Sequence, residues 1–478
     1  MKKILIGLGA LVVLLIAAVL VIPSLIPVDV YKREIIAGIE SATGRKARID
    51  GDFKLAILPR VEFVAGKVSL GNAPNGKAKN MVSLERLTVR VAVFPLLSGN
   101  LEIDTLVVEK PVISLEVDRL GKPNWQFAAT DKGAAAKPTG DAAGGAPGLS
   151  GIKLGDVRLV DGRVSYIDRK SGTSQRIDGI NLKVSLPSLT SPMRVEGSVV
   201  WNGEEISLTA MLANPNAFLA GQSTKVETSV KSKPVTFSFQ GSVAGGKSVT
   251  VKGRIDLDVP SVRKLAAWTG SPLDAPGTGL GPLKISGNLD MKGKVIAFRN
   301  AKFSLDSIAG EGDISFDQRR GKPFVKAALK VGKLDLNPYL PPEKAKPAKP
   351  AETKSGPGDW SDDPIDLSAL NSADAELDLS VAGLVVRKIK IGHSVLKVNL
   401  KNGVLVTELA KMELYGGVGK VKVTARAGRR ENTISLTSTL SKFQANPFLR
   451  DDMDFDRIEG MSNTVLNVTT RGSTQRQM

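Results

Sequence analysis

Cysteine is absent from this chain of 478 residues, histidine occurs once, and aromatic residues make up 5% of it. The lack of cysteine excludes disulfide bonds, zinc–thiolate sites and a cysteine nucleophile. A catalytic triad needs a positioned histidine, and His393 lies alone in an alternating segment where a structural or surface role is expected. Few aromatic rings leave little material for stacking nucleic-acid bases. We therefore expect neither an enzyme nor a cofactor or metal site.

One long apolar run begins the chain. No charged residue occurs between Lys3 and Asp29, and a helix rising 1.5 Å per residue over this run would cross a bilayer core of about 30 Å. Lys2 and Lys3 predict a cytoplasmic N-terminus. We expect a single-pass anchor over residues 1–27 with an exported body; a cleaved signal peptide is the alternative, and it exports the body equally. The anchor residues include Ile4, Leu8, Leu11, Leu15, Val19 and Ile22.

The chain is strongly basic, with a formal net charge of +18. Such a charge attracts anions, which include nucleic acids, phospholipid headgroups and lipopolysaccharide phosphates. A membrane anchor argues against nucleic acid as a partner, and the basic residues are spread along the chain as on an ordinary solvated surface. The charge therefore favours an envelope lipid or membrane surface as the anionic partner.

Two segments rich in Ala, Gly, Pro and Lys divide the body, and both are typical of linkers. The expected parts are an N-terminal domain at 28–127, a linker at 128–150, a repeated segment at 151–340, a linker at 341–360 and a further segment at 361–478. Helical spacing of apolar residues predicts a helix at 31–42, which Asp29 could cap and Gly44 would end. A second, shorter helix is expected from Pro260 to Gly270.

Most of the remaining body alternates between apolar and polar residues, which predicts strands with one dry face and one wet face. The apolar positions chosen as candidates for a lipid-binding groove are Leu87, Val89, Val91, Val93, Ile113, Leu115, Val117, Leu182, Val184, Leu186, Leu377 and Leu379. An ordinary hydrophobic core is the alternative at each of these positions.

Turn signals separate the alternating runs, as at Asn202-Gly203, Asp161-Gly162 and Asn402-Gly403. A loose repeat of strand, Gly and polar residue recurs at Gly197, Gly241 and Gly287, and Asn337-Pro338 and Asn446-Pro447 open similar phrases at strand ends. The expected fold is mainly β, an elongated, curled antiparallel sheet forming a groove behind one N-terminal transmembrane helix, with few short helices.

Three motifs imitate ligand sites without the required context. The phosphate-loop pattern at residues 241–248 is followed by a strand pattern instead of a helix, so we expect a hairpin turn. Asp452, Asp454 and Asp456 have the opening spacing of a calcium loop, but Arg457 and Asn463 occupy the positions that need Gly and Glu. Gly277, Gly279 and Gly281 precede no helix, which argues against dinucleotide binding.

An ordered series of short features resembles the AsmA family of bacterial envelope proteins. After the anchor come Thr43-Gly44-Arg45, Ile49-Asp50-Gly51-Asp52, Pro59, Gly71-Asn72-Ala73-Pro74, Leu96-Leu97-Ser98-Gly99-Asn100-Leu101, Ile103, Pro111 and Gly121-Lys122-Pro123-Asn124-Trp125. The resemblance covers the first 127 residues well and is looser beyond residue 151. Because members of the family usually continue further, the chain resembles a C-terminally truncated member.

The resemblance implies an inner-membrane anchor, a periplasmic body and a role in outer-membrane homeostasis. It also implies similarity to repeating β-groove proteins of the bridge-like type, which carry phospholipid between membranes. The leading hypothesis is therefore a protein that binds or conducts phospholipid or another envelope lipid along an apolar groove. The alternative hypothesis is a periplasmic factor that assists outer-membrane protein assembly by binding strands at a sheet edge.

Overall fold

The structure is a computed structural model. It describes residues 27–56, 61–92, 95, 102–127, 153–319, 321–341, 365–428, 431–453, 455–474 and 476–477. The expected membrane anchor, apart from its last residue, lies outside these ranges, as do Val93 and nearly all of both linkers. Among the helices of the described residues, none has the length and apolarity needed to cross a bilayer.

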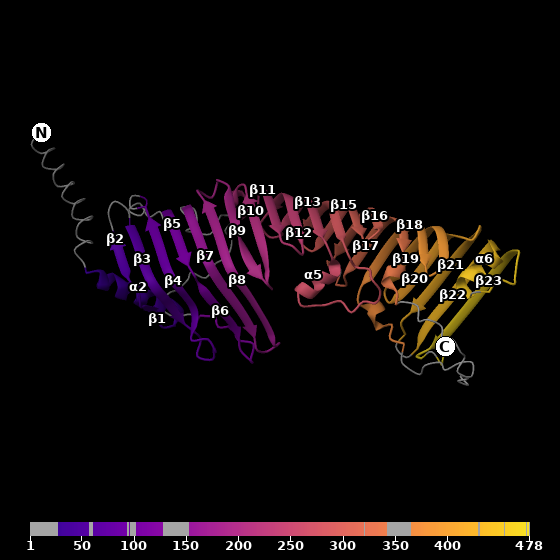
Figure 1. Cartoon of the computed structure of the whole chain (residues 1–478), viewed down its shortest axis with the longest axis horizontal. Helices are drawn as coiled ribbons and strands as arrows, with labels where there is room; N and C mark the ends of the chain where they lie inside the picture. Colours follow the sequence, from indigo (N-terminus) through magenta and orange to yellow (C-terminus); the bar gives the residue numbers. More distant parts are fainter. Residues whose placement is uncertain are drawn as a thin grey trace, which may run out of the picture. The chain divides into compact units, whose positions relative to one another are not determined.

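The described residues contain 23 strands, which join into one mixed sheet (Figure 1). Contacts divide the chain into a first unit, residues 1–233 with 243–247, and a second unit, residues 234–242 with 248–478. The strands of the first unit are β1 (Ala47–Ile49), β2 (Phe53–Ala56), β3 (Val61–Gly71), β4 (Asn80–Val91), β5 (Glu102–Glu109), β6 (Val112–Val117), β7 (Lys153–Asp168), β8 (Thr173–Leu186), β9 (Met193–Trp201), β10 (Glu204–Leu212) and β11 (Ser223–Lys231).

The second unit continues the same alternation of apolar and polar positions. Its strands are β12 (Thr236–Ala244, most of which belongs to this unit), β13 (Thr250–Val259), β14 (Leu283–Lys292), β15 (Val295–Leu305), β16 (Ile308–Asp317), β17 (Phe324–Asp335), β18 (Asp374–Val386), β19 (Ile389–Lys401), β20 (Val404–Leu414), β21 (Gly417–Arg426), β22 (Asn432–Gln444) and β23 (Met461–Gly472). The prediction of a mainly β fold with few short helices is confirmed.

Both predicted helices are present. α2 (Val28–Thr43) ends at Gly44, whose φ of 64° is the left-handed cap expected for glycine. The prediction that Asp29 caps α2 is wrong, because the cap position is Pro27 and Asp29 lies in the first turn. α5 (Val262–Trp268) is capped by the Ser261 side chain. The predictions missed α4 (Pro215–Leu219) and α6 (Ala445–Met453), and the 3₁₀ turns η1 (Asn337–Tyr339) and η2 (Ser368–Asn371).

The sheet is mixed because three of its recorded strand pairs are parallel. β5 and β6 lie end to end along β7, and β17 lies along β18. Parallel neighbours need a long crossover connection, and the chain supplies one between β6 and β7 and another between β17 and β18. The low-complexity segments of the sequence occupy these two connections. The expected antiparallel pairing holds for the other recorded pairs.

Two of the three predicted turns are confirmed. Asn202-Gly203 and Asn402-Gly403 both have positive φ and join adjacent antiparallel strands. The prediction at Asp161-Gly162 is wrong, because these residues form a bulge inside β7, where Asp161 has a φ of 51°. The Asp161 amide donates to the Asn181 side chain over 2.9 Å. The same left-handed conformation serves both a turn and a bulge, so the local sequence does not distinguish them.

Candidate functional site

Strand register brings six of the predicted groove residues of the first unit onto three common rows. Leu87 and Leu182 share a row, Val89 and Val184 the next, and Val91 and Leu186 the third. Residues of β5 and β7 complete these rows: Val108, Leu159, Leu106, Val157, Ile103 and Leu154. The alternation within β5 and β7 could have revealed them, but irregularities interrupt it between Ile103 and Leu106 and between Leu154 and Val157. Most of the predicted residues are half-buried, and Leu186 is buried.

The three predicted residues on β6 have different neighbours. Ile113 lies between Val82 and Val164 in the ladder and extends an apolar surface. Leu115 lies beside Tyr166. Val117 lies beside Asp168 and also bridges to Pro123, so its surroundings are mixed. The apolar surface of the first unit therefore includes Ile113 more clearly than Val117.

In the second unit, Leu377 and Leu379 belong to two apolar rows that extend across many strands. The row of Leu379 contains Leu329, Leu379, Leu396, Leu409 and Val421. The row of Leu377 contains Leu289, Phe298, Ile314, Ala327, Leu377, Val398, Val423 and Leu436, with Thr407 between Val398 and Val423. A third row contains Leu257, Ile285, Phe303, Val331 and Val381. Together they form the apolar face of the second unit, most of which is only half-buried.

The opposite, polar face of the second unit carries charges that pair across neighbouring strands. The recorded pairs include Lys284 with Asp258 at 3.3 Å and Lys326 with Glu376 at 3.1 Å. Their side chains remain 45–67% exposed, so each pair contributes at most about 1 kcal/mol to stability. This face is solvated, which leaves the apolar face as the candidate for binding a nonpolar ligand.

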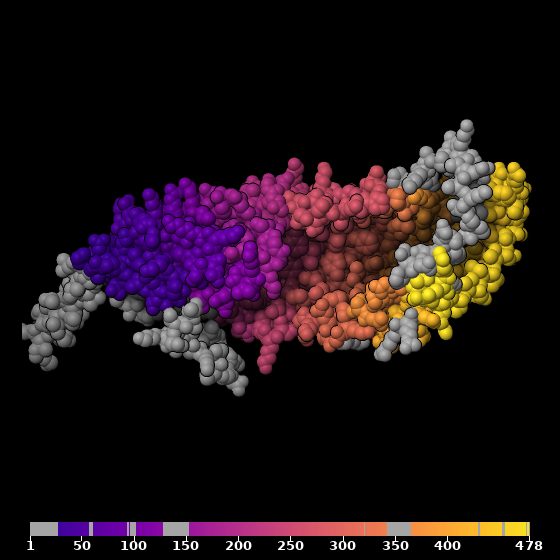
Figure 2. Space-filling view, turned by 90° about the horizontal axis from the view of Figure 1, so that it is seen from below, coloured from indigo at the N-terminus to yellow at the C-terminus, as the bar shows by residue number. Residues whose placement is uncertain are grey.

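Glycines crowd the apolar face near the middle of its strands. A Cβ on Gly253 would lie 2.6 Å from the Cα of Gly241, and one on Gly287 would lie 2.8 Å from the Phe298 ring. Side chains converge on the inside of a bend, so small residues there permit tight curvature. Figure 2 shows the second unit hollowed between two rims. The glycine contacts favour the apolar face as the lining of this hollow.

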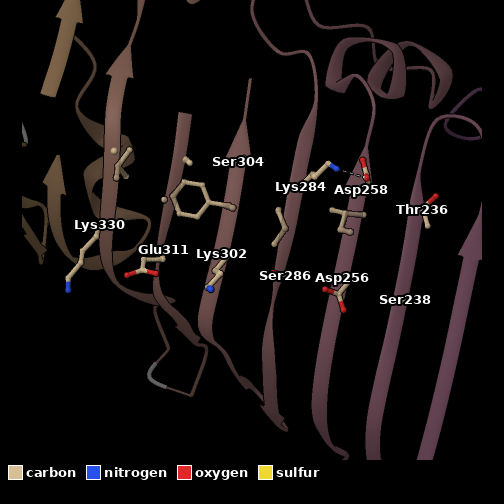
Figure 3. A pocket seen from close by; sticks show the side chains of 17 residues that line it. Thr236, Ser238, Asp256, Asp258, Lys284, Ser286, Lys302, Ser304, Glu311 and Lys330 are labelled. Atoms are coloured by element: carbon tan, nitrogen blue, oxygen red, sulfur yellow. Dashed lines mark ion pairs between the residues drawn. The ribbon is translucent and has the colours of Figure 1, made fainter. Parts of the chain in front are cut away.

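A cavity of about 830 Å³ in the second unit is lined by both polar and apolar residues (Figure 3). Its lining includes Leu257, Ile285, Phe303 and Val331 of the third apolar row, together with polar residues such as Thr236 and Ser238. A second cavity of about 500 Å³ shares Lys302, Glu311 and Lys330 with it. The first is lined by three carboxylates and three lysines. Because these charges balance, the cavity does not favour a ligand of one charge sign.

The motifs that imitate ligand sites have ordinary structures where they are described. Residues 241–244 end β12, and residues 245–249 connect it to strand β13, so a strand follows the pattern, as predicted. His393 lies 3.2 Å from the hydroxyl of Ser380. Asp454 lies outside the described residues, and the described part of the chain contains no cluster of metal-ligating side chains.

A buried carboxylate in the first unit was not predicted. Glu116 is 4% exposed and accepts hydrogen bonds from the amides of Lys77 and Ala78 at 2.7 and 2.8 Å. The Asn72 side chain and Arg169 also donate to it. Burial alone would raise the pKa of Glu116, but these donors and the positive charge of Arg169 outweigh burial and lower the pKa.

The Glu116 cluster holds two loops against the end of the sheet. The amide of Glu116 donates to Asn124, whose side chain donates to Asn72 and to the Ser114 carbonyl. The sequence contained two signals for this cluster, the segments around Asn72 and Asn124. They lie far apart in the chain, so the sequence did not show that they meet. All the carboxylate oxygens have partners, so the cluster is a structural support.

Comparison with known proteins identifies a family and no individual relative. The family model described as AsmA family matches residues 1–269 and, again, residues 261–478. No curated protein and no solved structure gives a significant match to the chain. The two matches together span the whole sequence, beyond the 127 residues in which the resemblance was clearest.

Proposed function

Because the chain belongs to the AsmA family, whose proteins are envelope-associated, we propose that it binds or conducts phospholipid along the apolar face of its sheet. Family membership and the large β-sheet fit an envelope-related protein. The observation that carries the finer proposal is the series of half-buried apolar rows that cross several strands of the second unit. The proposed site is the inner membrane, with a cytoplasmic N-terminus and a periplasmic body.

The dimensions of the second unit suit acyl chains. The strands β13 to β23, spaced about 4.8 Å apart, extend over about 50 Å. One leaflet of a bilayer core is about 15 Å thick, half of its 30 Å. Each CH₂ removed from water contributes about 0.8 kcal/mol. A lipid tail lying across the apolar rows would therefore recover much of the free energy that it loses on leaving the bilayer.

Native mass spectrometry of the full chain, combined with lipid extraction, tests this proposal. We expect several phospholipids per chain. Leu379→Asp places a charge among apolar side chains, so this variant should retain at most half as many lipids as the wild type. Ser380→Asp places the same charge on the other face of the same strand and should retain the wild-type number. A folded wild-type chain without lipid, or an equal loss in both variants, would contradict the proposal.

The exposed edge of β23 favours a second candidate function, assistance to outer-membrane protein assembly. Within the described residues β23 pairs only with β22, and its Val465 is 69% exposed. An open edge with exposed apolar side chains can receive an additional strand from an unfolded protein. Crosslinks from Val465 to outer-membrane proteins, in cells where Leu379 gives no lipid adduct, would favour this function over lipid binding.

A further inference from the structure

A small cavity in the first unit carries charge of one sign only. It has a volume of about 310 Å³ and lies beside the end of α2. Its charged lining residues are Arg45, Lys46, Arg48 and Lys79, and it has no acidic lining residue. The large cavity of the second unit, in contrast, balances three lysines with three carboxylates. The small cavity is therefore electropositive, and its ligand should be an anion.

The fold holds two of these cations on one side of β1. Ala47 and Ile49 are buried, with 8% and 5% exposure, so Lys46 and Arg48, which alternate with them, point to the other side. The Lys46 carbonyl accepts a hydrogen bond of 2.7 Å from the Gly71 amide. Arg48 lies opposite Ser69 in the ladder. The backbone positions of both cations are thus fixed by β3.

These cations are not neutralised by neighbouring carboxylates. In the part of the chain that the structure describes, Lys46, Arg48 and Lys79 take part in no recorded ion pair, and Arg45 donates to the Asn124 carbonyl at 3.3 Å. Ser69 and Asn80 add uncharged hydrogen-bonding groups to the wall. Several cations with free donors around one concave site are what a phosphate group requires.

We infer that this cavity binds a phosphate group, carried by a phospholipid headgroup or supplied as free phosphate. Arg45 follows the expected anchor by 18 residues in the sequence, so a headgroup of the anchoring membrane is one source. The inference does not rest on the apolar face: a phosphate group is recognised by charge and hydrogen bonds, and an acyl chain by apolar burial.

Phosphorus-31 NMR on the full chain in a phosphorus-free maltoside detergent tests the inference. The two probes are inorganic phosphate and the short-chain lipid dihexanoyl phosphatidylglycerol. We expect Lys46→Gln with Arg48→Gln to weaken binding by roughly thirtyfold, from the contribution of each basic side chain near an anion. The double variant Lys46→Arg with Arg48→Lys keeps both positive charges and should retain phosphate binding. Retained binding would show that the loss in the Gln variant comes from the lost charge and not from the substitution itself.

A matched control changes the same charge elsewhere. Lys420 and Lys422 also alternate on a strand, β21, and are exposed, so Lys420→Gln with Lys422→Gln should alter binding by less than about threefold. If the binding of both probes depends on Lys46 and Arg48, the cavity is a headgroup site. If only the binding of inorganic phosphate depends on them, the cavity is a free-phosphate site. No binding, or equal weakening in the control, overturns the inference. A failed lipid-groove proposal would instead show as lipid-free chains with intact phosphate binding.

Discussion

Replacement of Glu116 by alanine should lower the local stability of the first unit by about 3–5 kcal/mol. The carboxylate is buried and accepts four recorded hydrogen bonds, from Lys77, Ala78, Asn72 and Arg169. Alanine leaves these donors without an acceptor and Arg169 without its recorded ion-pair partner. Hydrogen–deuterium exchange of the full chain should show faster exchange in residues 72–78 and 112–117. Unchanged exchange there, or equal acceleration in β18, would contradict the structural role.

The same carboxylate should make the first unit sensitive to acid. Its folded pKa lies below the ordinary value of 4.5, so its stabilising contribution is complete above pH 4.5 and is lost as the pH falls through the folded pKa. Glu116→Gln removes this titration while keeping the shape of the side chain. Between neutral pH and the acid range, the protection factors of residues 72–78, which divide out the intrinsic pH dependence of amide exchange, should therefore fall less in Glu116→Gln than in the wild type.

Gly312→Ala should lower the stability of the second unit by about 2–4 kcal/mol. Gly312 has a φ of 154°, and a Cβ there would lie 2.0 Å from the Ala328 carbonyl oxygen. Two paired strands, β16 and β17, would have to separate to admit the methyl group. Denaturant unfolding followed by exchange in β16 and β17 measures the loss.

Gly332→Ala is the matched control for this prediction, since Gly332 lies in β17 with its nearest would-be Cβ contact at 3.4 Å and has no positive φ. We expect a change within about 1 kcal/mol. If both variants were equally stable, the close approach of the Ala328 carbonyl to Gly312 would not exist in solution.

Much of the fold follows from period-2 alternation, which depends only on the geometry of a strand. The details that were missed depend on distant segments. Asp161-Gly162 reads as a hairpin turn, and it becomes a bulge because β7 continues along β8 with Asn181 as the partner of its amide. The parallel pairing of β17 with β18 could not be predicted, because a linker sequence does not determine which strand its far end joins.

The candidate groove was predictable in part for the same reason. Leu87 and Leu182 are apolar positions in separate strands, and only strand register shows that they lie in one row with Val108 and Leu159. Glu116 alternates with Leu115 and Val117 and would be expected to face solvent. It is buried because the loops around Asn72 and Asn124 close over it, and alternation carries no information about such loops.

Site-specific photocrosslinking in cell membranes tests the central claim most directly. A benzophenone amino acid is placed at Leu379 or at Ser380 of the full chain, two neighbouring positions on opposite faces of β18. After irradiation, mass spectrometry identifies the adducts. If the apolar face binds lipid, position 379 gives phospholipid adducts and position 380 gives few or none. Lipid adducts at 380 but not at 379, or protein adducts alone at 379, would contradict the account.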